Sequence, residues 1–334
     1  MNTTIAKFAV GAAIGALVLT ACATDGVAVD GRFPARFPDA AQYNRVAVLE
    51  FEGRNGPIVS SELAAELGSA SLDGELLLDV VNESQLLANA GVRSFGNSDA
   101  QIAAALNVGR QMGVEGVYIG QVTDYDASRT SRRVQRSECL EWEGFLNCKR
   151  SRDYTVSCYE ETALVSAAPR LVSVATGSVV YTSTVTGRAE TDWCDDRPRT
   201  ISETELMSQA RADAVRQIRR HVAPYNDTFT VRLKTGNDGV PEALQAQNAG
   251  AVEFGQAGRM DRACAIWQEM DALNEHQSVS LIYNMGVCAE VVGDFERATQ
   301  LYSRADSLLT SPDSLISEAL LRARSMQSGE RAIN

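Results

Sequence analysis

The residues of this chain whose chemistry depends most on spacing are its cysteines, seven in a sequence of 334 residues. Four of them lie in one stretch: Cys139, Cys148, Cys158 and Cys194. Structural zinc sites usually pair cysteines about two to four residues apart. Here eight, nine and thirty-five residues separate successive cysteines, and neither histidine is near them in the sequence. A C-x-x-C redox motif is also absent, so we expect no metal site and instead expect disulfides, provided that the compartment is oxidising.

The beginning of the sequence indicates the compartment. An apolar run at residues 8–21 is shorter than the roughly 20 residues of a membrane span and is typical of a signal peptide. It ends in Leu-Thr-Ala-Cys at residues 19–22, which resembles a bacterial lipobox. The resemblance implies cleavage before Cys22, diacylglycerol on its thiol and acylation of the new amine. Several acyl chains, palmitate among them, give stable anchoring.

Ala23, where an inner-membrane lipoprotein would carry Asp, implies sorting to the outer membrane. We therefore expect a signal peptide over 1–21 and a protein held by its lipid at the periplasmic face of a Gram-negative outer membrane. An ordinary cleavage near Ala21 is the alternative. Residues 22–44 contain the doubled RFPARFP and lack periodicity, so they are expected to form an extended lipidated tether.

Composition and motifs argue against several classes of function. The net charge of −12 disfavours sequence-independent nucleic-acid binding, which requires Lys and Arg to neutralise phosphates. We find no Ser–His or Cys–His set, P-loop, G-x-G-x-x-G or H-E-x-x-H motif. His221 ends a predicted helix and is interpreted as a cation that complements the helix dipole, whereas His276 falls in a predicted turn. We expect no enzyme, no cofactor, no metal and no nucleic-acid partner.

Hydrophobic patterning predicts an α+β domain over 45–234, with an α/β-type sheet, an antiparallel hairpin and covering helices. Strands are expected at 45–53, in a stretch ending at Val81, at 114–126 and at 227–234. Helices are expected at 58–71 and 98–113. Two more helices should run from an N-cap at Ser84 to Gly91, and from the capping box of Ser202 and Glu205 to Pro224. The last helix should bury Leu206, Ala210, Ala214, Ile218 and Val222. Residues 235–241 are expected to be a linker.

The predicted hairpin decides between the three possible pairings of the four cysteines. Residues 154–190 are rich in Val, Thr and Tyr, with a turn at 175–178. Chain reversal there places Cys158 opposite or nearly opposite Cys194, at the Cα separation of about 4.5–5.5 Å that facing strand residues have. Cys139 then pairs with Cys148 and closes a small loop through a turn at 143–144.

The last third of the chain contains a repeat. Residues 249–270 and 284–305 align at an offset of 35, with small residues, a Gly and an aromatic residue in matching places. The pattern resembles the tetratricopeptide repeat, which implies an all-α helical repeat unit over 242–327 with a concave face for a peptide or protein. A purely stabilising helical cap is the alternative. Cys264 and Cys288 lie on adjacent repeat helices, and we favour free, buried thiols there over a third disulfide.

Residues 45–234 resemble the CsgG-like curli-secretion group of outer-membrane lipoproteins, which includes lipoprotein activators of penicillin-binding proteins. The resemblance rests on VAVLEFEG, VVNESQLL, GVEGVYIGQVTDYD and LVSVATGSVVY, which are mostly hydrophobic patterns. It implies one of two activities. One is a ring-forming channel whose inserted hairpins become membrane-spanning strands, and the other is a module that presses on a partner enzyme.

The charges of the inserted segment argue against the channel. A spanning strand needs about 9–11 residues with every second one apolar. In the insert (residues 125–158), charged residues occupy both alternation phases, and the second candidate stretch at 185–202 is equally charged. A Lys or Arg on the lipid face costs about 2–4 kcal/mol at the midplane. We therefore expect a polar insert that is stapled by disulfides and stays outside the bilayer.

The sequence thus predicts a non-enzymatic adaptor or accessory factor in envelope assembly or secretion. It would bind a periplasmic or outer-membrane protein through the helical repeats and the insert, and homo-oligomers are possible. The candidate contact residues in the insert are Trp142, Phe145, Arg132, Arg133 and Arg136. A solvated loop explains them equally well. The alternatives are a subunit of a CsgG-like oligomeric secretion channel and an activator of a periplasmic peptidoglycan synthase.

Overall fold

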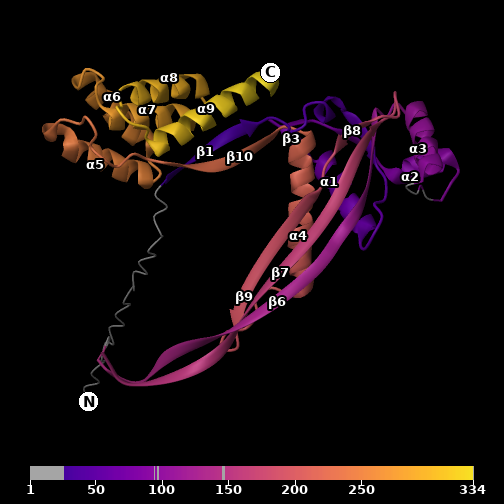
Figure 1. The fold of residues 1–334 in the computed structure, drawn as a ribbon, viewed down its shortest axis with the longest axis horizontal. Helices are drawn as coiled ribbons and strands as arrows, with labels where there is room; N and C mark the ends of the chain where they lie inside the picture. Colours follow the sequence, from indigo (N-terminus) through magenta and orange to yellow (C-terminus); the bar gives the residue numbers. More distant parts are fainter. Residues whose placement is uncertain (1–25, 94, 96–97, 145–146, 334) are drawn as a thin grey trace, which may run out of the picture. The chain divides into compact units, whose positions relative to one another are not determined.

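A computed structural model describes residues 26–93, 95, 98–144 and 147–333 of the chain. It divides the chain into two compact units (Figure 1). Of the described residues, the sheet unit comprises those in 32–227 and 328–333, and the helical unit comprises those in 26–31 and 228–327. The predicted fold class, α+β with a C-terminal helical unit, is confirmed. The signal peptide and Cys22 lie outside the described residues.

The sheet unit contains a mixed sheet with the strand order β5-β2-β6-β7-β8, and β9 pairs with β7 beside this path. Its strands are β2 (Arg45–Val48), β3 (Ser71–Leu72), β4 (Glu75–Leu76), β5 (Asp79–Val81), β6 (Gly116–Glu143), β7 (Asn147–Ser173), β8 (Val179–Thr182) and β9 (Val185–Cys194). Its helices are η1 (Ala40–Gln42), α1 (Gly56–Gly68), α2 (Glu83–Ala90), α3 (Asp99–Gln111) and α4 (Glu203–Val222). Strand β2 runs parallel to β5 and β6, whereas β6, β7, β8 and β9 pair antiparallel.

Helices cover both faces of this sheet, as the alternation of strand side chains requires. Val46 and Val48 belong to the core shared with α1 and α4. Ala47 and Leu49 belong to the opposite core, which α2 and α3 complete. All five residues of the predicted apolar face of α4 are buried, and Ser202 caps the helix by accepting from the N–H of Glu205 at 3.1 Å.

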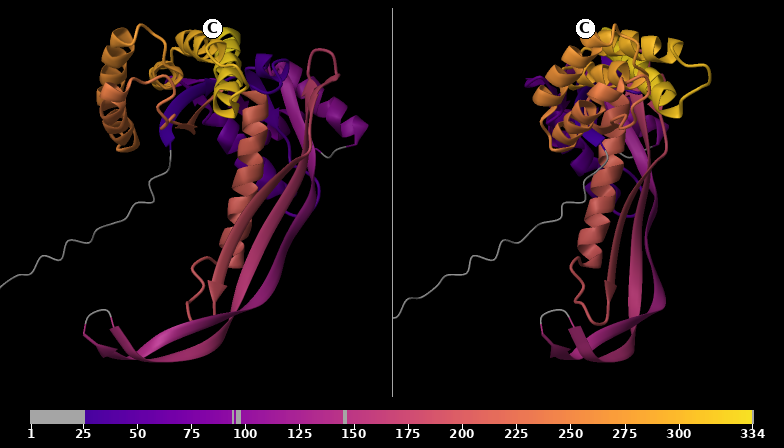
Figure 2. Two further views of the ribbon diagram at one scale, coloured as in Figure 1. Left: turned by 60° about the vertical axis from the view of Figure 1, so that its left-hand side comes forward. Right: turned by 90° about the vertical axis from the view of Figure 1, so that its left-hand side faces the viewer.

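Strands β6 and β7 form a hairpin far longer than expected, with 28 and 27 residues (Figure 2). Past the end of β9 at Cys194 they continue as two strands, here called the ribbon (residues 132–143 and 147–157). The expectation of a compact loop is wrong, because cross-strand pairing continues up to Glu143 and Asn147. Both faces of the ribbon are charged: Arg136 and Glu138 share one face, whereas Arg133 and Asp153 share the other.

The helical unit contains five helices among the described residues: α5 (Glu242–Gln256), α6 (Met260–Leu273), α7 (Val279–Val291), α8 (Phe295–Ser307) and α9 (Ser314–Ile333). The repeat predicts its packing well. Trp267 and Tyr302, the matched aromatic residues, are both fully buried. A Cβ at Gly286 would lie 2.4 Å from the ring of Tyr302, so the small residue at this crossing is required by the close approach of α7 and α8.

Three element predictions are wrong. Residues 26–33, expected within the tether, form β1 (Gly26–Phe33), because the buried Val27 and Val29 alternate with the exposed Ala28 and Asp30 and enter the core of the helical unit. The strand near 227–234 is β10 (Tyr225–Arg232), and it pairs with β1 rather than with the edge of the main sheet. The N-cap of α2 is Asn82, whose side chain accepts from the N–H of Ser84 at 2.9 Å.

Candidate functional site

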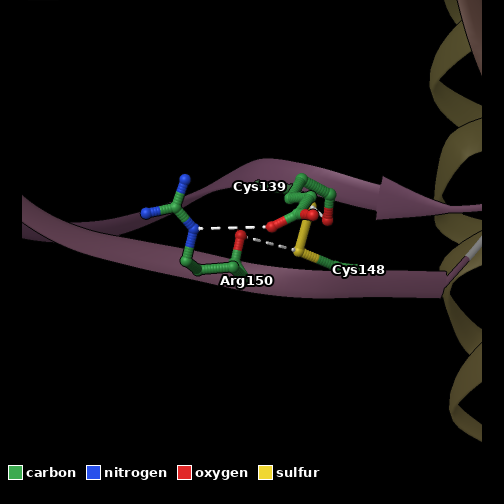
Figure 3. Close-up of a disulfide and its surroundings, with 4 residues drawn as sticks. Cys139, Cys148 and Arg150 are labelled. Carbon is green, nitrogen blue, oxygen red and sulfur yellow. Dashed lines mark hydrogen bonds and ion pairs between the residues drawn. A yellow bond between two sulfur atoms is a disulfide. The ribbon is translucent and has the colours of Figure 1, made fainter.

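The far end of the ribbon carries the first predicted disulfide and the exposed tryptophan. Cys139 and Cys148 are bonded, with Cα atoms 5.8 Å apart, and the side chain of Arg150 lies beside them (Figure 3). The register shifts on both sides of Glu141, so Trp142 faces Cys148 directly. Trp142 is 59% exposed and Leu140 is 45% exposed. The ribbon therefore carries two exposed apolar side chains near its disulfide, among the charged residues of the same end. Phe145 lies outside the described residues.

The basic residues of the insert do not form one patch, contrary to what their clustering in the sequence suggests. Arg136 is an ion-pair partner of Asp196 (3.2 Å) and donates to Sγ of Cys194. Other pairs join Arg129 to Glu161, Lys149 and Arg150 to Glu141, and Arg152 to Glu138. Arg132 and Arg133 form no ion pair within the described part of the chain, and as successive strand residues they point to opposite faces.

The second predicted disulfide lies where β9 ends. Cys158 faces Cys194 in the register of β7 and β9, with Cα atoms 3.9 Å apart, closer than expected for a facing pair. Both cysteines are buried with Val156. Among the described residues, no group of three or more His, Cys, Asp or Glu could hold a metal ion.

A buried carboxylate three residues along β7 from Cys158 was missed by the sequence analysis. Glu161 is 2% exposed and is held by Arg129 at 3.2 Å and by Arg199. Both guanidinium groups also lie over the ring of Trp193, at 5.1 and 4.7 Å from its centroid. One signal could have revealed the position, because Glu161 shares its strand phase with the buried residues Ala163 and Val165.

His221 does not act as the predicted helix-capping cation. Its side chain is buried against Phe37, and its Nδ1 shares a hydrogen bond with the hydroxyl of Tyr181 at 3.1 Å. Burial, and then the nearby positive charge of Arg36, lowers the pKa of His221 below its ordinary value. The imidazole is therefore neutral at neutral pH, and it serves as a packed hydrogen-bonding group.

In the helical unit, the predicted linker covers the face formed by α5, α7 and the start of α9. We call residues 232–240 the covering segment. Asn284 of α7 accepts from the N–H of Lys234 and donates to its carbonyl oxygen, both at 2.9 Å. The carbonyl oxygen of Arg232 accepts from the hydroxyl of Tyr283 at 2.9 Å, and that of Gly236 accepts from Asn248 of α5.

Charged and apolar contacts complete the attachment of the covering segment. The Lys234 ammonium pairs with Asp313 at 2.8 Å, and burial leaves Leu233 and Val240 only 5% and 6% exposed. The first helices of the repeat thus hold an extended segment of their own chain through its backbone. The side-chain amides of Asn248 and Asn284 are therefore occupied by the backbone of the chain itself.

A different face of the helical unit is open. A hollow of about 610 Å³ lies between α6, α7 and α8, and its apolar lining includes Ile282, Met285 and Leu301. The third disulfide, between Cys264 of α6 and Cys288 of α7, also lines it. The expectation of free thiols is wrong, because the two side chains meet where α6 and α7 pack together, with Cα atoms 5.8 Å apart.

Comparison with known proteins gives no family for this chain. No protein-family model matches it, and no curated protein matches it. Among solved structures, the PelC dodecamer from Paraburkholderia phytofirmans is 13% identical, with a TM-score of 0.29, and the match covers 59% of this chain and 98% of that chain.

Two further structural matches are to bacterial lipoproteins. Lipoprotein GNA1162 from Neisseria meningitidis is 17% identical, with a TM-score of 0.27, over 52% of this chain and 97% of that chain. The LpoB C-terminal domain from Salmonella enterica is 12% identical, with a TM-score of 0.25, over 46% of this chain and 94% of that chain. TM-scores this low support no argument about function. Within the described residues, no helix is long and apolar enough to cross a membrane.

Proposed function

We propose that this protein is a non-enzymatic adaptor or accessory factor of the bacterial envelope, anchored in the outer membrane through lipid on Cys22. In this proposal the sheet unit is CsgG-like and the helical unit is tetratricopeptide-like. The observation that carries the proposal is the end of the ribbon, where a disulfide holds the exposed Trp142 and Leu140 in a fixed strand geometry.

Physical reasoning favours a protein partner for this surface. Tryptophan is enriched at protein interfaces and among the few residues that supply most of the binding energy. Ordering a contact surface on binding costs conformational entropy, and a surface already fixed by a covalent bond avoids part of that cost. The charges on both faces of the ribbon favour its exposure to water, and Leu140 and Trp142 are its exposed large apolar side chains among the described residues.

In-cell photo-crosslinking tests this proposal. The photoreactive residue p-benzoylphenylalanine replaces Leu140 near the end of the ribbon, or the exposed Gln135 on its shaft as a matched control. We expect a discrete crosslinked protein from position 140 and not from position 135. Trp142→Ala should reduce that product about tenfold, as loss of a central interface tryptophan does. Identical products from the two positions would refute contact through the ribbon end.

The anchor is tested separately by metabolic labelling with an azide-bearing palmitate analogue. The full chain should incorporate the label and fractionate with outer membranes. Cys22→Ala should abolish labelling, because the lipobox resemblance places the acyl chains on that residue. Labelling that persists in this variant would contradict lipidation at Cys22 and leave the ribbon contact to be judged by its own experiment.

A further inference from the structure

The hollow between α6, α7 and α8 is an open recess of the helical unit, with buried apolar side chains in its wall and exposed charged side chains around them. Ile282 is fully buried, and Leu301 and Ala289 are 8% and 7% exposed. The Cys264–Cys288 disulfide fixes α6 against α7 along one wall. A recess with such walls is largely formed before a ligand arrives. Only the side chains that cover the buried Asp271 must move for a ligand to reach its carboxylate.

One polar group in this hollow is unexplained by the fold. Asp271 is 2% exposed and lines the hollow. Its Oδ2 is held by Nδ1 of His276, but its Oδ1 is buried without a hydrogen-bond partner among the described residues. An unsatisfied buried acceptor costs about 1–3 kcal/mol.

The position of Asp271 on its helix adds to this cost. The residue lies in the last turn of α6, where the helix dipole disfavours a negative charge. A ligand that donates a hydrogen bond to Oδ1 of Asp271 would satisfy the unpartnered atom and offset the unfavourable charge at the helix end. A cationic donor does so best, because charge-assisted hydrogen bonds are about twice as strong as neutral ones.

We propose that the hollow binds a lysine or arginine side chain of a partner polypeptide, with its aliphatic stem on the apolar wall and its cationic end on Oδ1 of Asp271. Long basic side chains bury their stems on apolar surface in this way. Asp261 and Asp294 also line the hollow. Arg297 of α8 lines it as well and would supply donors for the carbonyl groups of the same polypeptide, whereas Arg304 already donates to the carbonyl oxygen of His276 at 3.3 Å. This inference rests on the proposed function as a protein-binding adaptor and names the chemistry of one contact.

Two labelled pentapeptides provide the probes for this site. They are amidated Ala-Leu-Lys-Leu-Ala and the same peptide with norleucine, which has the stem without the charge, in place of the lysine. Fluorescence anisotropy measures their binding to the oxidised full chain in non-ionic detergent. The salt concentration is about 150 mM, where the Debye length is about 8 Å. We expect the lysine peptide to bind about tenfold more tightly, and Asp271→Asn to remove this preference.

Matched variants separate the site from general effects. Asp306→Asn removes the same charge from an exposed position of α8 and should leave the preference unchanged. Ala289→Phe fills the hollow without altering Asp271 and should weaken both peptides at least tenfold. Thermal unfolding shows whether each variant is folded.

Three results would contradict a cation-binding site in the hollow. Equal binding of the two peptides, an unchanged preference in Asp271→Asn, or no binding of either peptide at millimolar concentration would overturn it. Crosslinking from position 140 does not involve the hollow, so the proposed function can stand when this inference fails. Failure of both experiments would contradict the proposed adaptor function as well.

Discussion

At the scale of single residues, two buried glutamates, Glu161 and Glu290, are each paired with an arginine from elsewhere in the sequence. Glu161 is the clearest case, since two arginines from distant parts of the sequence converge on one buried carboxylate. Arg199 belongs to the segment that leads into α4, so this pairing also fixes the start of that helix. The burial of a charge is tolerated here because both carboxylate oxygens have a partner.

Replacing Glu161 tests this role. Glu161→Gln should lower the free energy of unfolding by about 1–3 kcal/mol, because two guanidinium groups lose their countercharge. The loss stays below that of a fully buried pair, since the Arg129 side chain is 46% exposed and can turn to water. Glu160→Gln, on the opposite face of the same strand, is the control. Equal urea midpoints for the two variants would contradict a stabilising role for Glu161.

His221 makes stability depend on pH. The native state lowers its pKa below the ordinary value of 6.5, mainly by burial. The native state therefore favours the neutral ring, so this contribution is complete above the unfolded pKa and is lost as the pH falls toward the native one. We expect unfolding free energies measured from pH 7.5 to 5 to fall in the wild type and to fall less in His221→Gln. An equally reduced fall of the unfolding free energy in His276→Gln would contradict the assignment of this pH dependence to His221.

At the scale of elements, the two disulfides of the hairpin have different physical tasks. Cys158–Cys194 joins β7 to β9 inside a small apolar cluster and closes a longer loop, with a sequence separation of 36. Cys139–Cys148 joins the two strands at the far end of an exposed ribbon across a sequence separation of 9. The first should therefore contribute to global stability and the second to local order.

Paired serine variants distinguish these tasks. Cys158→Ser with Cys194→Ser should lower the free energy of unfolding by about 2–4 kcal/mol. Cys139→Ser with Cys148→Ser should change it by less than about 0.5 kcal/mol, because the ribbon end lies away from the cores. Amide hydrogen exchange should instead rise at 138–143 and 147–152. Unchanged exchange there would mean that strand pairing alone holds the ribbon end.

The elements also show what the sequence could and could not predict. Apolar periodicity located α1, α3 and α4, and the turn at 175–178 gave nearly the correct register for Cys158 and Cys194. The ribbon was missed as a strand pair because cross-strand ion pairs and a disulfide stabilise it, and neither leaves an apolar alternation. The hollow was missed because its wall residues are distributed over three helices whose packing only the structure reveals.

At the scale of the whole molecule, each of the two units has its own apolar core and its own disulfides. The covering segment leads from the end of β10 to α5 within the helical unit, and side chains of α5 and α7 bind it. Its sequence, with two glycines among polar residues just before a proline, is that of a flexible linker. The segment is nevertheless bound, because its backbone forms the hydrogen bonds that the buried side chains of Asn248 and Asn284 need.

Removing one of these asparagines should release the segment. Asn284→Ala deprives the N–H and carbonyl groups of Lys234 of their partners, which costs about 1–3 kcal/mol. The Lys234 side chain, now 12% exposed, then becomes accessible, and trypsin should cut after it several-fold faster than in the wild type. Gln247→Ala, which removes a side-chain amide from an exposed position of α5, should leave the cutting rate unchanged. Mass spectrometry of the fragment ending at Lys234 measures the rate, and rapid cutting of the wild type at this bond would show that the segment is a linker after all.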